Sequence, residues 1–326
     1  MSIDVRGLRC FLAVVSAGSI SRAAEAMHLA QPALSLQIKH IEEALGVALF
    51  ARSHRGVAPT AAGLRFERHA RDILKRLDLA CEDVRDLATD LEGRVAIGLP
   101  QSMAKILTLP VVRETLRRWP RIQLQIIELS SGYIPDQLLR GHLDIGLTFQ
   151  TDARASLRFE HLIDEDLVLL LPPQSSEPLS VVQASRPDNL PTVAFSDLGR
   201  YPMILPTREH GLRALIERHL SARYVDLPVL AEANTIAQLI ELVAAGVGHT
   251  VLSYASVCAE VRQGLLSAAC IRDPSISRPV YLCRSVTTPF SSAASAVLEL
   301  MVGTVQSLVA EGRWPARLNE IQTGPG

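Results

Sequence analysis

Three polar side chains near the start of the chain have types and a spacing that suit contact with the edges of DNA bases. Gln31, Ser35 and Lys39 are four residues apart, so a helix would place them on one face. Glutamine and serine can hydrogen-bond to base edges in the major groove, and lysine can reach a guanine or a phosphate. An ordinary amphipathic helix with a solvated face would carry the same stripe, so the neighbouring elements have to decide between the two interpretations.

The elements around this stripe are typical of a helix-turn-helix. Gly18 and Ser19 supply a stop for a first helix and an N-cap for a second. Ala23 and Ala24 in the second helix are small enough to let another helix cross closely. The third helix begins near Gln31, because the proline that follows suits a first helical turn. Its buried stripe recurs at i, i+4, i+7 and i+11, with Leu34, Ile38, Ile41 and Leu45.

A basic turn follows the third helix and predicts a wing. Residues 51–57 form two short extended segments around a basic turn, and Gly56 ends that turn. Arg52 and Arg55 on such a hairpin could hold phosphates or enter the minor groove. Residues 1–59 contain six Lys and Arg against four Asp and Glu, so the positive excess is small and local.

The head resembles the LysR-type regulator family over a continuous stretch that starts near residue 3. The matching motifs are Leu8-Arg9-Cys10-Phe11, Gly18-Ser19-Ile20-Ser21-Arg22-Ala23-Ala24, Gln31-Pro32-Ala33-Leu34-Ser35, Gln37-Ile38, Leu45-Gly46, Leu49-Phe50 and Arg52. The resemblance implies a winged helix-turn-helix that binds double-stranded promoter DNA. It also adds Ser21, Arg22 and Pro32 to the expected DNA-binding residues.

One position departs from the family pattern. Leu36 stands where the family usually has arginine or glutamine. We expect the base contact from that position to be absent, or replaced by an apolar contact with a thymine methyl group. The operator sequence therefore does not carry over from the family.

A long helix with a heptad pattern follows the wing. Thr60 can cap it, and it is expected to run to about Leu91. Its apolar positions alternate spacings of four and three: Phe66, Ala70, Ile73, Leu77, Ala80, Val84, Leu87 and Leu91. A helix packed on its own domain would show a similar stripe. The resemblance favours a linker that pairs antiparallel with a second copy, in a homodimer or homotetramer, and so sets the spacing of half-sites.

Strands and helices alternate from Gly93 onward, which predicts an α/β domain. Strands are expected near 95–99, 122–128, 143–147, 167–171, 203–205 and 250–252, and helices near 107–119, 135–140, 209–222, 234–245 and 289–310. The segments Leu129-Ser130-Ser131-Gly132 and Leu139-Arg140-Gly141-His142-Leu143-Asp144-Ile145-Gly146 match turns of LysR-type effector domains. That likeness implies two lobes resembling a periplasmic binding protein, with crossovers near 162–166 and 267–272.

The expected organisation has four parts. A winged helix-turn-helix covers 1–59, a dimerising linker helix 60–92, an effector domain 93–312 and a flexible tail 313–326. Lobe one is expected at about 93–163 and 270–312, and lobe two at about 164–269.

Polar residues after strands and at helix starts are candidates for binding a small-molecule effector. Loops at the carboxyl ends of strands and helix N-termini converge in such clefts with unpaired N–H groups. The candidates are Gln101, Ser102, Ser130, Ser131, Thr148, Phe149, Pro206, Thr207, Asn234 and Thr235. Each residue could also be a plain helix cap.

Composition and motifs argue against a membrane protein, a metalloprotein and an enzyme. The 326 residues carry a formal net charge of -1, and no run approaches the roughly 18 apolar residues of a membrane span. We expect a cytoplasmic protein with reduced, mostly buried cysteines, no metal and no cofactor. An enzyme lacks support, because no nucleophile elbow or P-loop is present, and Gly246-Val247-Gly248 lacks the third glycine of a dinucleotide fingerprint.

Two further interpretations stay open. A solute-binding protein shares the two-lobed fold but has no use for a DNA-reading head. Some LysR-type regulators act without a small molecule, and 91–99 with 128–132 resemble a nitrogen-assimilation-control-like subgroup of that kind. The family resemblance also implies RNA polymerase as a partner. Whether the chain activates or represses is left open.

Overall fold

The computed structural model describes residues 3–53, 56–84, 91–173, 190–208, 211–288 and 290–319. The chain forms two compact units. Unit 1 combines Met1–Asp90 with Asp136–Leu143 and Ser285–Ser291. Unit 2 combines Leu91–Pro135, Asp144–Arg284 and Ser292–Gly326.

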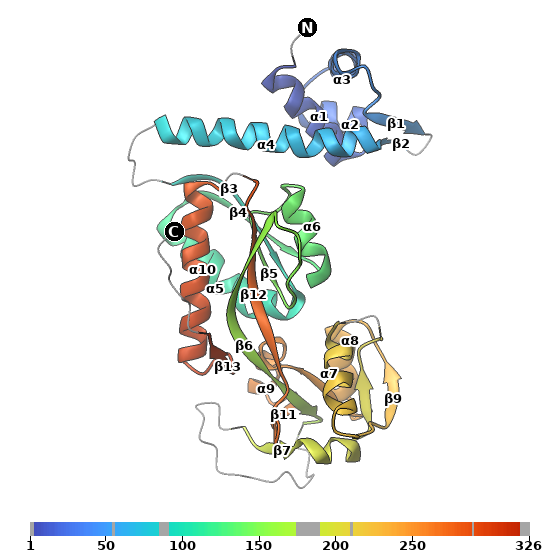
Figure 1. The fold of residues 1–326 in the computed structure, drawn as a ribbon, viewed down its shortest axis with the longest axis vertical. Helices are drawn as coiled ribbons and strands as arrows, with labels where there is room; N and C mark the ends of the chain where they lie inside the picture. Colours follow the sequence, from blue (N-terminus) through green and yellow to red (C-terminus); the bar gives the residue numbers. More distant parts are fainter. Residues whose placement is uncertain are drawn as a thin grey trace. The chain divides into compact units, whose positions relative to one another are not determined.

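Three short helices make the head of unit 1: α1 (Val5–Ala17), α2 (Ile20–Ala26) and α3 (Gln31–Leu45) (Figure 1). Asp4 caps α1 by accepting a 2.7 Å hydrogen bond from the backbone N–H of Gly7. Gly18 ends α1 with φ near 60°, a conformation that glycine adopts at little cost. Ser19 then caps α2, as the sequence predicts. Leu34, Ile38 and Ile41 of α3 pack on α1 and α2, so all three helices share one core. Leu45 was expected to belong to the same buried stripe, but it lies in the last turn of α3 and is 39% exposed.

Strands β1 (Phe50–Ser53) and β2 (Gly56–Pro59) form an antiparallel hairpin, which confirms the predicted wing. The backbone N–H of Val57 donates to the carbonyl oxygen of Gly18 at 3.1 Å. A Cβ atom on Gly56 would lie 2.5 Å from that same oxygen, so no side chain fits there. The base of the wing is therefore packed directly against the turn between α1 and α2.

Helix α4 (Ala61–Val84) is the predicted linker helix. Thr60 caps it by accepting a 3.0 Å hydrogen bond from the N–H of Gly63. Residues 85–90, where the helix was expected to continue through Leu87, lie outside the described residues. Phe66 and Ala70 pack into the core of unit 1, with the Phe66 ring 4.9 Å from that of Phe11.

Unit 2 contains a sheet with the strand order β4-β3-β5-β12-β6-β11-β7, with β10 and β13 also pairing with β6. Its first lobe is built from β3 (Glu92–Leu99), β4 (Arg121–Glu128), β5 (Ile145–Thr148) and the first part of β6 (Leu157–Leu171). Helices α5 (Gln101–Arg118) and α10 (Ser292–Ala310) pack together on this lobe. The short α6 (Ile134–Leu139) precedes β5 in the sequence, and its residues from Asp136 onward belong to unit 1. The long strands β6 and β12 (Ser277–Ser285) run side by side (Figure 1).

The second lobe is built on the last part of β6. Strands β10 (Thr250–Ser253) and β11 (Ser267–Arg272) pair antiparallel with it, and β7 (Thr192–Ala194) pairs parallel with β11. A separate two-stranded sheet holds β8 (Met203–Leu205) and β9 (Val229–Glu232). The helices of this lobe are α7 (Gly211–Ser221), α8 (Ile236–Ala244) and the short α9 (Cys258–Arg262). The two-lobed α/β architecture is the predicted one.

The expectations for the start of α5 and for the C-terminal tail need correction. Helix α5 begins at Gln101, well before the predicted start at 107, and it accommodates Pro110 in its interior. The predicted flexible tail is ordered through Asn319: Trp314 is buried, and β13 (Ala316–Leu318) pairs with β6. Helix α10 is long and apolar enough to cross a membrane by composition, with a mean hydropathy of 1.5. It instead packs against α5 and β3 as a core helix of unit 2.

Candidate functional site

The outward face of α3 is defined by the residues that the core leaves uncovered. Leu34, Ile38 and Ile41 are buried against the other helices. The opposite side of α3 carries an exposed row, with Pro32, Leu36, Lys39 and Glu43. Gln31 is exposed and Ser35 half-buried on the flank of this row, so all the predicted base-reading residues of α3 lie on one accessible side.

Hydrogen bonds orient part of this surface. The Ser21 hydroxyl donates to Oε1 of Gln31 at 3.1 Å, which leaves the amide N–H groups of Gln31 available to an acceptor. Arg22 is exposed one residue further along α2. Lys39 pairs with Glu43 at 3.5 Å, and both side chains are at least half exposed. Such a pair contributes at most about 0.5 kcal/mol, so a phosphate can readily replace the glutamate.

Glu42 positions the wing, a role that the sequence pattern did not indicate. Its Oε1 accepts hydrogen bonds from the backbone N–H groups of Leu49 at 2.7 Å and Phe50 at 3.1 Å. The start of β1 is thereby tied to α3. Arg52 belongs to β1, but its side chain and the whole of Arg55 lie outside the described residues.

The predicted seam of α4 divides into an internal and an exposed part. Phe66 and Ala70 pack in the core of unit 1, where the Phe66 ring contacts the Phe11 ring. Because this core covers them, they are not available to contact a second copy of the chain. Ile73 and Leu77 are 49% and 39% exposed, and Ala80 is exposed as well. The side chain of Val84 and all of Leu87 lie outside the described residues, and Leu91 is half-buried at the start of unit 2.

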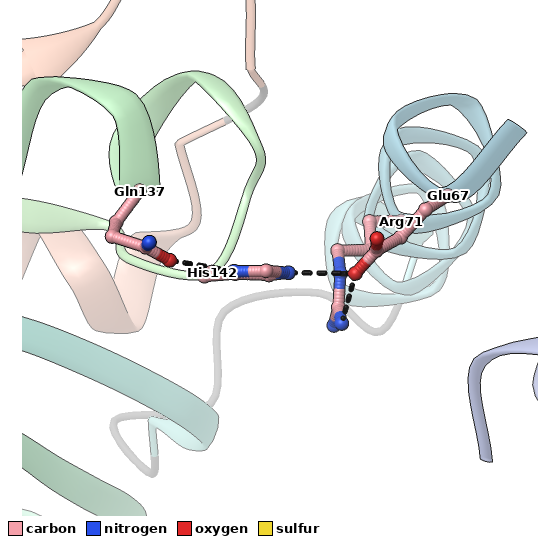
Figure 2. A network of polar contacts seen from close by, with 4 residues as sticks. All are labelled: Glu67, Arg71, Gln137 and His142. Carbon is pink, nitrogen blue, oxygen red and sulfur yellow. Dashed lines mark hydrogen bonds and ion pairs between the residues drawn. The ribbon is translucent and has the colours of Figure 1, made fainter. Parts of the chain in front are cut away.

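A buried carboxylate lies on α4, within unit 1. Glu67 is 4% exposed and accepts hydrogen bonds from Nη2 of Arg71 at 2.9 Å and from Nε2 of His142 at 2.7 Å (Figure 2). Nδ1 of His142 lies 2.7 Å from Oε1 of Gln137. Burial alone would raise the pKa of Glu67, but the hydrogen bonds from His142 and Arg71 outweigh it and lower that pKa. Burial lowers the pKa of His142. The network fastens the segment 136–143 to α4.

Unit 2 contains a cavity of about 850 Å³ between its two lobes. Of the predicted effector-binding residues, seven line it: Gln101, Ser102, Ser130, Ser131, Phe149, Pro206 and Asn234. The wall is completed by polar and charged side chains that the sequence pattern did not single out, with Glu128, Tyr133, Gln150, Arg218, Ser253, Ser256 and Arg278. A volume of this size suits a small organic molecule.

Three predicted effector residues do not reach the cavity wall. Thr148 is 1% exposed, and its hydroxyl donates a hydrogen bond to the backbone carbonyl oxygen of Gln150 at 3.3 Å. Thr235 accepts a hydrogen bond from the N–H of Gln238 as the N-cap of α8. Thr207 is half-buried in the segment before α7 and is not among the lining residues. Thr148 and Thr235 therefore have structural roles, Thr148 in a turn with Gln150 and Thr235 as a helix cap.

An ion pair closes one side of the cavity. Arg278 on β12 is 6% exposed and donates from Nε to Glu165, a fully buried residue of β6. Its Nη2 donates to the Ser102 hydroxyl at 3.1 Å, and its guanidinium stacks 3.5 Å from the centre of the Phe149 ring. The positive charge of Arg278 is thus balanced inside the wall.

Glu165 connects distant parts of unit 2. Besides Arg278, it accepts hydrogen bonds from the Ser253 hydroxyl at 2.7 Å and from Nε1 of Trp314 at 3.1 Å. These donors come from β10 in the second lobe and from the segment after α10. One buried carboxylate therefore joins both lobes and the C-terminal segment.

Metal-binding and thiol chemistry have little support in the described ranges. No group of three or more His, Cys, Asp and Glu side chains there could hold a metal ion. Cys10, Cys270 and Cys283 are buried as expected, whereas Cys81 on α4 is exposed. Burial raises the pKa of the Cys283 thiol to about 12, which keeps it protonated.

Two family profiles match the chain. The profile described as a bacterial regulatory helix-turn-helix protein of the lysR family matches residues 5–64. The profile described as the LysR substrate binding domain matches residues 88–306. Together they cover both units.

Curated relatives match almost the whole chain. The nitrogen assimilation regulatory protein nac of Klebsiella aerogenes is 30% identical over 319 residues, covering 95% of this chain and 98% of that protein. The HTH-type transcriptional regulator BbuR of Bordetella bronchiseptica is 28% identical and covers 96% and 93%.

Solved structures share the fold. A full-length OxyR variant from Pseudomonas aeruginosa superposes with a TM-score of 0.75 at 21% identity, over 100% of both chains. Full-length CbnR in complex with its target DNA gives a TM-score of 0.55 at 20% identity, over 92% of this chain and 99% of that one.

Proposed function

Because this chain belongs to the LysR family of transcriptional regulators, we propose that it binds promoter DNA through the outward side of α3. The family makes it a DNA-binding regulator with an effector-binding domain rather than an enzyme. The observation that carries the proposal is the accessible side of α3, where Gln31 and Ser35 flank the exposed row that lies opposite the buried stripe. In this arrangement α3 enters the major groove.

Each contact residue receives a role from its chemistry. Gln31 and Ser35 hydrogen-bond to base edges, while Ser21 holds Gln31 in place. The basic residues position the head on the sugar-phosphate backbone, with Arg22 and Lys39 from the helices and Arg52 and Arg55 from the wing. Pro32 has no side-chain donor and contributes an apolar contact. Base contacts supply sequence preference, and phosphate contacts supply affinity for any duplex.

We expect the Gln31→Ala/Ser35→Ala double variant to lose preference for its operator. Each lost base contact costs about 1 to 3 kcal/mol of specific binding, whereas binding to unrelated duplex is nearly unchanged. Competition between operator and unrelated DNA measures the ratio. Arg52→Ala is the matched comparison, and it should weaken binding to all sequences alike. If the double variant, like Arg52→Ala, lowered specific and nonspecific binding equally, the assigned roles would be wrong.

The exposed part of α4 is proposed to pair two copies of the chain. Ile73 and Leu77 stand four residues apart on the accessible side of the helix, and their apolar surface becomes buried when two helices pair. A dimer presents two heads to a pseudo-palindromic operator, and a tetramer would pair two such dimers. We also propose that the DNA-bound regulator contacts RNA polymerase at the promoter and that the protein is located in the cytoplasm.

We propose that the cavity of unit 2 binds a small-molecule effector. Its size and its serine, glutamine and asparagine lining support this. Ligand binding that draws the lobes together would shift the balance between two states of the regulator. The alternative, a regulator of the same fold that needs no effector, is favoured if no small carboxylate or amino-acid metabolite raises the unfolding temperature while promoter control is intact. A bound ligand at 100 times its Kd would add about 2.7 kcal/mol of stability.

A further inference from the structure

We infer that Leu36 reads the C5-methyl group of a pyrimidine, thymine or 5-methylcytosine, in the major groove. The inference rests on the proposed DNA-binding function and adds to it a named chemical group on the DNA. It also implies that binding responds to methylation of cytosine at the contacted position.

The first step is the direction in which Leu36 points. It comes two residues after Leu34 and two before Ile38, so it stands about 200° around the helix from each of these buried side chains. Leu36 is therefore on the side of α3 opposite the core. A helix that enters a groove with its core side outward directs this residue toward the base edges.

The second step is its exposure. Leu36 leaves 51% of its surface in water, although the core of unit 1 buries Leu34, the other leucine of the first three turns of α3. Its exposed neighbours Pro32 and Ala33 are also apolar, and the next charged side chain on the row is Lys39. A single exposed leucine is common in proteins. Here it is grouped with two other apolar residues, amid the polar side chains proposed to contact DNA.

The third step is what such a patch can contact. Phosphates need positive charge or hydrogen-bond donors, and neither Leu36 nor Pro32 offers a side-chain donor. In the major groove each base pair presents donors and acceptors, and thymine alone among the four usual bases adds an apolar group, its C5-methyl. 5-Methylcytosine carries the same group at the same position. A pyrimidine methyl is thus the groove feature that matches Leu36.

The size of the effect follows from the area removed from water. Burying one methyl-sized group against an apolar side chain changes an equilibrium constant about fourfold. A dimer that contacts one methyl in each half-site would lose about sixteenfold if both were removed and the two sites act independently.

The test uses the full chain and a duplex that the chain itself selects from a library with a random core. Each thymine of the selected duplex is replaced in turn by deoxyuridine, which lacks only the methyl group. We expect one position in each half-site to lose about fourfold in affinity. In Leu36→Ala the same replacement should have little effect. Leu45→Ala removes another exposed leucine from the far end of α3, and this variant should keep the full sensitivity.

A second arm restores the methyl on a different base. Cytosine paired with guanine at the sensitive position lowers affinity, and 5-methylcytosine there should recover about fourfold with the unaltered chain and nothing with Leu36→Ala. The inference is overturned if the chain binds its selected duplex but no thymine position is sensitive, or if Leu36→Ala retains the same sensitivity. Failure to select or bind any duplex would instead remove the proposed function, and the inference with it.

Discussion

Replacing Ile73 and Leu77 together by aspartate is expected to turn the chain into a monomer with a correctly folded head. Both side chains are exposed on α4, so the folding of unit 1 does not need them, whereas paired helices would have to bury four carboxylates. Without pairing, the two heads bind their half-sites independently. Affinity for a two-half-site duplex should fall by a factor of about 100 or more.

Sedimentation equilibrium and binding to the same duplex check this result together. Leu64→Asp is the matched control, because Leu64 is 44% exposed on α4 but lies outside the 66–70–73–77 seam. That variant should remain a dimer with unchanged affinity. A dimeric Ile73→Asp/Leu77→Asp protein would place the pairing surface elsewhere.

Glu165→Ala is expected to lower the free energy of unfolding of unit 2 by about 3 to 5 kcal/mol. The substitution leaves the guanidinium of Arg278 buried without its counter-charge and removes the acceptor for Ser253 and Trp314. Trp119 and Trp314 are the two tryptophans of the sequence, and both belong to unit 2. Urea denaturation followed by tryptophan fluorescence therefore reports on this unit.

Two further variants test the physical reason. Glu311→Ala breaks an ion pair with Arg313 whose side chains are 54% and 51% exposed, so it should cost no more than about 0.5 kcal/mol. Adding Arg278→Met to Glu165→Ala removes the unpaired charge and should recover part of the lost stability. Equal stability of the Glu165→Ala and Glu311→Ala proteins would rule out the buried ion pair as a major contributor.

Patterns with a local cause were predictable from the sequence. The buried stripe of α3 follows from helical periodicity, and Ser19 and Thr60 cap helices because a hydroxyl in that position accepts a free backbone N–H. The wing was indicated by a basic turn that ends in a glycine, and the close approach of Gly56 to Gly18 explains why glycine is needed there. Seven of ten effector candidates line the cavity because strand ends and helix starts converge in this fold.

Features that depend on distant parts of the chain were not predictable. Arg278 and Glu165 are 113 residues apart, and nothing near either residue indicates the other. Trp314 looked like part of a polar tail, but its indole finds both an apolar site and the Glu165 carboxylate. Phe66 and Ala70 fit a heptad seam and the core of unit 1 equally well, because packing against a second helix and packing against this core both need apolar residues at the same spacing. The sequence pattern also did not indicate that α5 begins at Gln101 rather than near 107, or that Pro110 lies in the interior of this helix.

The central claim is that paired heads hold duplex DNA against the outward side of α3, and the most direct test is affinity as a function of salt. The full chain is titrated with a duplex taken from the DNA upstream of its own coding region, by fluorescence anisotropy at several salt concentrations. We predict a dimer whose binding constant falls with salt, with a log–log slope of about -0.9 for each phosphate contacted. A monomer with no salt-dependent affinity for any duplex would contradict the account.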